Sequence, residues 1–80
     1  MLRDIYVFGA GGLGREIAAT LQLPGFTATY RLRGFVDDGL PAGSLVNGLP
    51  VAGNKQWLLK QSGACVVTGI GNPVVRQSLA

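Results

Sequence analysis

The sequence has 80 residues, of which 48% are hydrophobic and 14% charged, and its formal net charge is +3. This composition is too apolar for a disordered or low-complexity chain, and the length corresponds to one small domain or part of one. The absence of histidine excludes a histidine base or metal ligand, and the single cysteine excludes a disulfide or zinc site built within the chain. We therefore expect these residues to bind a ligand and to contain no catalytic centre.

The basic residues are spread along the chain rather than clustered. They are Arg3, Arg15, Arg31, Arg33, Lys55, Lys60 and Arg76. Without a run of Lys or Arg, the sequence does not indicate binding to nucleic acid, although the mild positive balance suits a small anionic ligand such as a nucleotide. The apolar run 5–8 is too short for a signal peptide, and no stretch approaches the roughly 20 apolar residues of a membrane span. We expect a cytoplasmic protein that does not bind membranes.

The first half of the chain predicts a strand, a helix and a second strand. Residues 4–8 are apolar on both faces, as in a buried parallel strand, and the glycine-rich turn 9–14 follows. A helix then continues to about residue 21 or 23, where Pro24-Gly25 ends it. Residues 30–36 predict the second strand. In this strand one set of side chains alternates with another: Tyr30, Leu32, Gly34 and Val36 with Arg31, Arg33 and Phe35.

The second half predicts a surface loop, a short third strand, a short helix and a buried fourth strand. These segments are residues 39–49, 48–53, 55–61 and 64–68. Asn54 is placed to cap the short helix, and Cys65 is expected to be an inert core residue of the fourth strand. Asn72 and Pro73 predict the start of a further helix that continues to Ala80, with Asn72 as its N-cap.

The alternation of strands and helices predicts an α/β fold with a parallel sheet and right-handed crossovers. With the expected strands numbered in chain order, the strand order is 3-2-1-4, a Rossmann-like sheet. Ligands bind such sheets beyond the carboxyl ends of the strands, here the first and the fourth. Because the last expected helix has no C-terminal cap, we expect residues 1–80 to be the front of a longer protein.

The glycine-rich turn matches G-x-G-x-x-G between a strand and a helix. Gly9 permits the tight turn, Gly11 lets the backbone approach a diphosphate, and Gly14 permits close packing of the helix on the sheet. The start of the helix adds N–H donors and positive partial charge. The pattern thus favours nucleotide or phosphate binding, with a tight turn alone as the alternative.

Two acidic residues end the second strand. Asp37 lies where a Rossmann acid contacts a ribose hydroxyl, but Asp37 and Asp38 also suit a turn before Gly39. Both interpretations stay open at this point.

A second glycine turn follows the fourth strand. Gly69-Ile70-Gly71-Asn72 should face the first glycine turn across one crevice. Arg15 and Arg76 could each contact a phosphate or stay in solvent. Trp57 is expected to pack its short helix onto the sheet rather than to stack on a base.

Four ordered segments resemble a known family, that of the sialic acid O-acetyltransferase NeuD and the nucleotide-sugar N-acetyltransferase PglD. The segments are Ile5 to Gly12 (IYVFGAGG), Gly34 to Asp38 (GFVDD), Asn47 to Gly53 (NGLPVAG) and Gly69 to Asn72 (GIGN) followed by Arg76. The resemblance covers nearly the whole chain and is to the N-terminal domain of that family. Leu13 stands where the family often has a histidine.

The resemblance implies a Rossmann-like domain that binds the acceptor, often a UDP-linked amino sugar or a related sugar. It implies that a C-terminal left-handed β-helix binds acetyl-CoA, carries the catalytic histidine and forms a homotrimer. By resemblance, the substrate-binding residues are Gly9, Gly11, Gly12, Leu13, Gly14, Asp37, Asp38, Val51, Gly69, Gly71 and Asn72. The loop would contact the diphosphate, the two acids the uridine, and the second glycine turn would close the crevice.

Two other functions share part of this pattern. An NAD(P)-dependent oxidoreductase also has G-x-G-x-x-G and an acid after the second strand. An ATP-using adenylyltransferase also has Gly-Ala-Gly-Gly-Leu-Gly, but it continues with Ser where this chain has Arg15. Both remain alternatives to the acceptor-binding domain.

Overall fold

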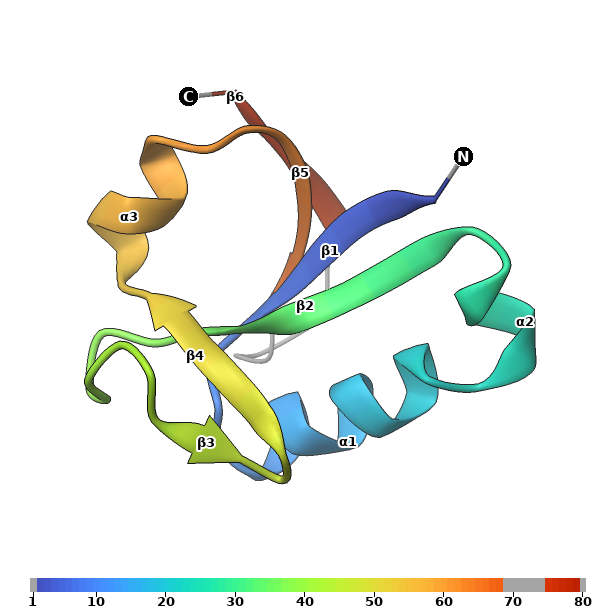
Figure 1. Cartoon of the computed structure of the whole chain (residues 1–80), viewed down its shortest axis with the longest axis horizontal. Helices are drawn as coiled ribbons and strands as arrows, with labels where there is room; N and C mark the ends of the chain where they lie inside the picture. Colours follow the sequence, from blue (N-terminus) through green and yellow to red (C-terminus); the bar gives the residue numbers. More distant parts are fainter. Residues whose placement is uncertain (1, 69–74, 80) are drawn as a thin grey trace.

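The computed structural model describes residues 2–68 and 75–79. Its strands form one sheet, and its helices lie against that sheet (Figure 1). In chain order they are β1 (Arg3–Phe8), α1 (Gly12–Leu21), α2 (Pro24–Thr27), β2 (Tyr30–Val36), β3 (Leu45–Val46), β4 (Leu49–Gly53), α3 (Lys55–Leu59), β5 (Ser62–Thr68) and β6 (Val75–Leu79).

The sheet has the order β3-β4-β2-β1-β5-β6. Its four central strands, β4, β2, β1 and β5, are parallel, which confirms the predicted Rossmann-like α/β class and the order 3-2-1-4. The edge strands β3 and β6 are antiparallel to their neighbours, so the whole sheet is mixed. A purely parallel sheet was expected because the hairpin β3–β4 and the strand β6 have weak sequence signals.

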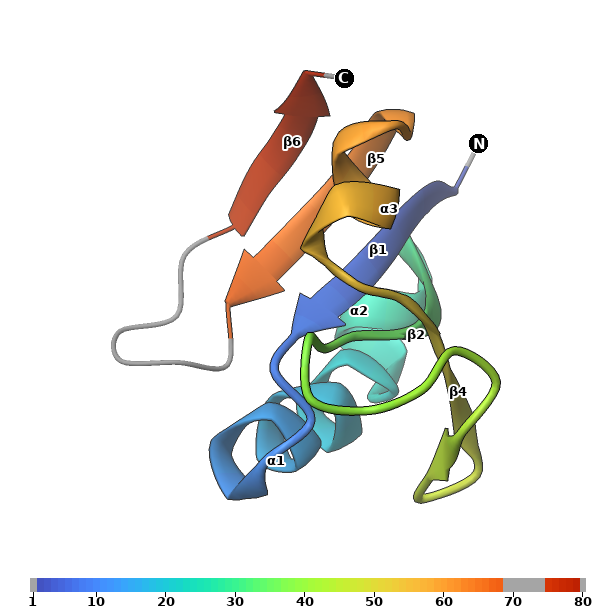
Figure 2. The ribbon, with the colours of Figure 1, turned by 90° about the vertical axis from the view of Figure 1, so that its left-hand side faces the viewer.

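The predicted helix after Pro73 is wrong for the residues that the structure describes. Residues 75–79 form β6, which runs antiparallel to β5 with Val75 opposite Val67 and Gln77 opposite Cys65 (Figure 2). A single short helix is costly to nucleate, whereas the edge of β5 offers backbone partners at once. The expected cap Asn72 lies outside the described residues.

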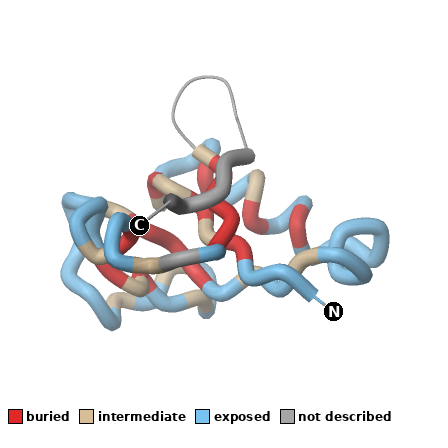
Figure 3. The backbone as a smooth tube through the Cα atoms, turned by 90° about the horizontal axis from the view of Figure 1, so that it is seen from above, coloured by how far each residue is buried: buried red, intermediate tan, exposed pale blue. Residues whose placement is uncertain are grey.

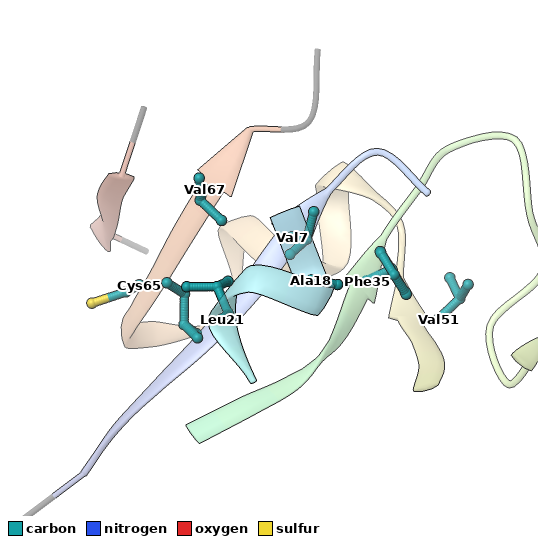
Figure 4. Close-up of a cluster of buried hydrophobic side chains, with 8 residues drawn as sticks. Val7, Ala18, Leu21, Phe35, Val51, Cys65 and Val67 are labelled. Atoms are coloured by element: carbon teal, nitrogen blue, oxygen red, sulfur yellow. The ribbon is translucent and has the colours of Figure 1, made fainter. Parts of the chain in front are cut away.

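Helices cover both faces of the sheet. Figure 1 shows α1 and α2 on one face and α3 on the other. The core on the α1 face contains the fully buried side chains of Ile5, Val7 and Phe35, together with Ala18 and Leu21 of α1 (Figure 4). The smaller core under α3 contains Val36, Leu58 and Val66. Buried residues lie at the centre of the molecule and exposed ones around it (Figure 3).

An irregularity in β2 changes which residues face each core. The register with β1 shifts so that Leu32 pairs with Ile5 but Gly34 pairs with Tyr6. Gly34 has a φ of +149°, and a Cβ there would collide with the carbonyl oxygen of Pro50 in β4. As a result the side chain of Phe35 lies in the α1-face core together with that of Leu32. Strict alternation along the strand would instead place Phe35 on the same face as Arg31.

The short helices begin and end where local residues favour it. Pro24 was expected only to end the first helix, yet it is also the first residue of α2, where its missing N–H is not needed. Asn54 caps α3 as predicted, since its side-chain oxygen accepts a hydrogen bond of 2.9 Å from the N–H of Trp57.

Among the described residues no helix is long and apolar enough to cross a membrane.

Candidate functional site

The glycine-rich turn connects the carboxyl end of β1 to the start of α1. Gly9 has a φ of +98°, which favours glycine, and its N–H donates a 2.8 Å hydrogen bond to the carbonyl oxygen of Val36. A Cβ on Gly14 would collide with the carbonyl oxygen of Gly9. Folding alone therefore requires glycine at these two positions, as the sequence predicts for the turn and for close packing.

Gly11 and Gly12 differ from these two because neither the backbone angles nor close packing require glycine there. Neither has a positive φ, and a Cβ on either would meet no atom within 4 Å. Gly11 is the N-cap of α1, where no side chain caps the helix and the first turn holds no acidic residue. The positive end of α1 is thus exposed beside two glycines that leave its backbone open, an arrangement that suits an anion.

Asp37 contacts this loop directly. Its Oδ2 accepts a hydrogen bond of 2.9 Å from the N–H of Ala10, and its Oδ1 accepts one of 2.7 Å from the N–H of Gly39. The carboxylate is half-buried at the end of β2. The structure thus brings Asp37 to the glycine loop and also forms the turn before Gly39 that was one of the two interpretations, while the expected contact with a ribose stays a prediction.

Asp38 takes part in a different contact. Its side chain is exposed, and its Oδ1 accepts a hydrogen bond of 2.8 Å from the N–H of Lys55 at the start of α3. The N–H of Asp37 donates to the carbonyl oxygen of Gly53 at 3.0 Å. The end of β2 is therefore tied to the loop after β1 and to the loop after β4.

The other expected site residues do not all lie beside the glycine turn and the end of β2. The side chain of Val51 is buried in the α1-face core, where it lies opposite Phe35. Leu13 is 40% exposed and lines an open apolar depression of about 360 Å³ with Ile17 and Phe26. Gly69, Gly71 and Asn72 lie outside the described residues, as does the side chain of Arg76. Arg15 is exposed.

Trp57 packs α3 onto the sheet, as expected. Its ring meets the ring of Tyr6 edge to face, with centroids 5.3 Å apart and an interplanar angle of 72°. A Cβ on Gly53 would lie 2.5 Å from the Trp57 ring, so the small residue before α3 makes room for it. In the described part of the chain, no group of three His, Cys, Asp or Glu residues is placed to hold a metal ion.

Sequence reasoning missed the hydrogen bond from Ala10 to Asp37. The two residues are 27 positions apart, and only the pairing of β1 with β2 brings them together. The signal available was the acid at the end of the second strand, which the Rossmann pattern assigns to a ligand.

The four parallel strands at the centre of the sheet, with β1 leading through a glycine turn into α1, define the Rossmann-like class, in which ligands bind beyond the carboxyl ends of the strands. The chain matches the family model of the PglD N-terminal domain over residues 4–80, and it belongs to that family. No curated protein and no solved structure shows a significant match to it.

Proposed function

We propose that this domain binds the acceptor of an acetyl-CoA-dependent acetyltransferase, a nucleotide-linked sugar such as a UDP-linked amino sugar, or a sialic acid. The observation that carries the proposal is the match to the PglD N-terminal domain over residues 4–80. The open glycines at the start of α1 support it, because they leave backbone N–H groups accessible to a diphosphate.

The domain would contribute binding and orientation to the reaction. The glycine loop holds the diphosphate, the end of β2 borders the nucleoside, and the sugar points away toward acetyl-CoA held by another domain. Fixing two reactants in the correct geometry can by itself supply a large part of a rate enhancement. In this proposal a β-helix domain forms the trimer and supplies the catalytic histidine, a residue type that these 80 residues do not contain.

A panel of ligands tests this function. Thermal unfolding of the chain would be followed with UDP-sugars, CMP-sialic acid, NAD, NADP, ATP and acetyl-CoA. A ligand present at about 100 times its dissociation constant stabilises a protein by about 2.7 kcal/mol, which raises the Tm of a small domain by roughly 10–20 °C. We expect a shift with UDP-sugars or CMP-sialic acid. A shift with NAD or ATP alone would instead support the oxidoreductase or the adenylyltransferase.

The variant Gly11→Val locates the binding site. We expect it to abolish binding of the UDP-sugar, because the added side chain occupies the space that the diphosphate needs. The matched control is Gly25→Val in α2, where a Cβ also meets no atom within 4 Å. Isothermal titration of both variants gives the comparison. Binding that survives Gly11→Val would contradict the assignment of the loop.

A further inference from the structure

We infer that Asp37 is a positioning residue, which fixes the glycine loop for the ligand and does not itself accept a hydrogen bond from the ribose. This inference rests on the proposed function only for the identity of the ligand. The hydrogen bonds that carry it are formed between residues of this chain.

Both oxygens of the Asp37 carboxylate already accept a backbone hydrogen bond. Oδ2 accepts from Ala10 N–H at 2.9 Å and Oδ1 from Gly39 N–H at 2.7 Å. An ionised carboxylate accepts hydrogen bonds and donates none, and those it accepts from N–H groups are stronger than bonds between neutral groups. A carboxylate offers about four acceptor sites, so a ribose hydroxyl would have to share an oxygen that already accepts from the backbone.

The loop needs such an anchor. Glycine backbones lose more conformational freedom on folding than others, and the turn 9–14 contains four glycines without side chains to hold it. Two consecutive N–H groups of this turn, those of Gly9 and Ala10, donate to the end of β2, to Val36 and Asp37. The first bond continues the backbone pairing of the sheet. The second depends on one side chain, so Asp37 decides where the Ala10 peptide and the following Gly11 lie.

Asp38 provides a matched control in the next position. It has the same side chain, but it is exposed and accepts from Lys55 N–H at the start of α3, not from the glycine loop. Replacing either acid by alanine removes one negative charge from the same strand end. A difference between the two variants therefore cannot come from the change in net charge, which is the same in both.

The first experiment measures hydrogen exchange of single backbone N–H groups by NMR in the full chain without ligand. We expect Asp37→Ala to accelerate exchange at Ala10 at least 10-fold, while the N–H of Val7 within β1 keeps its rate. Asp38→Ala should leave Ala10 unchanged. If Asp37→Ala does not fold, the wild-type chain still gives an answer, because a scalar coupling across the hydrogen bond from Ala10 N–H to the Asp37 carboxyl must be present. Unchanged exchange at Ala10, or no such coupling, would overturn the inference.

The second experiment separates positioning from ribose contact. UDP and 2′-deoxy-UDP are titrated into the wild type and into both variants. A positioning role predicts equal affinity for the two nucleotides within about twofold in the wild type, and a loss of at least 10-fold for both in Asp37→Ala. A wild type that prefers UDP at least 10-fold, with the preference lost in Asp37→Ala, would assign Asp37 to the ribose. If neither nucleotide binds, a UDP-linked acceptor is contradicted, and the exchange experiment alone decides the role of Asp37.

Discussion

Gly12 and Gly14 are two residues apart at the start of α1, yet an added methyl group meets different surroundings at each. At Gly12, the first residue of the helix, it enters open space, and at Gly14 it collides with the carbonyl oxygen of Gly9. Alanine is favoured over glycine within a helix by about 0.5–1 kcal/mol. Only one of these two glycines is therefore required by the fold.

We expect Gly12→Ala to raise the free energy of unfolding by up to about 1 kcal/mol and to weaken UDP-sugar binding. Stability and binding should change in opposite directions, because the position favours alanine for folding and glycine for the ligand. Urea denaturation and isothermal titration measure the two effects. A variant that is more stable and binds equally well would show that the ligand does not approach Gly12.

We expect Gly14→Ala to lower the free energy of unfolding by at least about 2 kcal/mol, since α1 must move away from the turn at Gly9. Urea denaturation measures this free energy, and Gly12→Ala is the control because it also adds one methyl group to a glycine of α1. Equal stability of the two variants would contradict the close packing of α1 on the glycine turn.

At the scale of elements, α3 depends on its cap. It has five residues, too few to be stable by helix propensity, and its first turn is closed by the side chain of Asn54. We expect Asn54→Ala to lower the free energy of unfolding by about 1 kcal/mol. The control is Gln56→Ala at an exposed position within α3, which should change the free energy of unfolding little. Denaturation followed by Trp57 fluorescence measures both, and equal values would argue against the cap.

The elements differ in how far their own residues determine them. The cap Asn54 and the glycine turn follow from adjacent residues, and the sequence predicted them. It also predicted that α1 ends at residue 21 or 23, and the helix ends at Leu21. The strand β6 follows from the edge that β5 presents, and the local signal of Asn72 and Pro73 pointed to a helix instead. A short segment with mixed signals adopts the structure whose backbone partners are available.

At the scale of the whole molecule, a small domain has little stability to lose. Phe35 is fully buried between β1 and β4, whereas Phe26 of α2 is 40% exposed. We expect Phe35→Ala to lower the free energy of unfolding by about 3–5 kcal/mol and to leave the chain largely unfolded at 37 °C. Phe26→Ala should lower it clearly less. Circular dichroism during heating compares the same substitution at both sites. Similar Tm values would place Phe35 outside the core.

The candidate site was predictable in part. Features formed by neighbouring residues were predicted, and contacts between residues far apart in the sequence were not. The turn from Gly9 to Gly14 was identified because its spacing is local. The partner of Asp37 was not, because the sequence places an acid at the end of β2 but does not say which donor lies opposite it. Val51 shows the same limit, since its side chain was expected beside the ligand and is buried against Phe35.

The residues alone predicted β1, α1, β2, β4, α3 and β5 in their order, the parallel centre of the sheet and the resemblance to the family, because hydrophobic periods, caps and glycine spacing are properties of neighbouring residues. They did not predict α2 or β3, and they favoured a helix where β6 lies. The tertiary structure alone decided the register shift at Gly34, the side of the sheet on which Phe35 lies, and the hydrogen bond from Ala10 to Asp37. Each of these depends on how strands that are distant in the sequence pair with each other. A register shift of one residue moves a side chain to the other face of the sheet, and the register is a property of both paired strands.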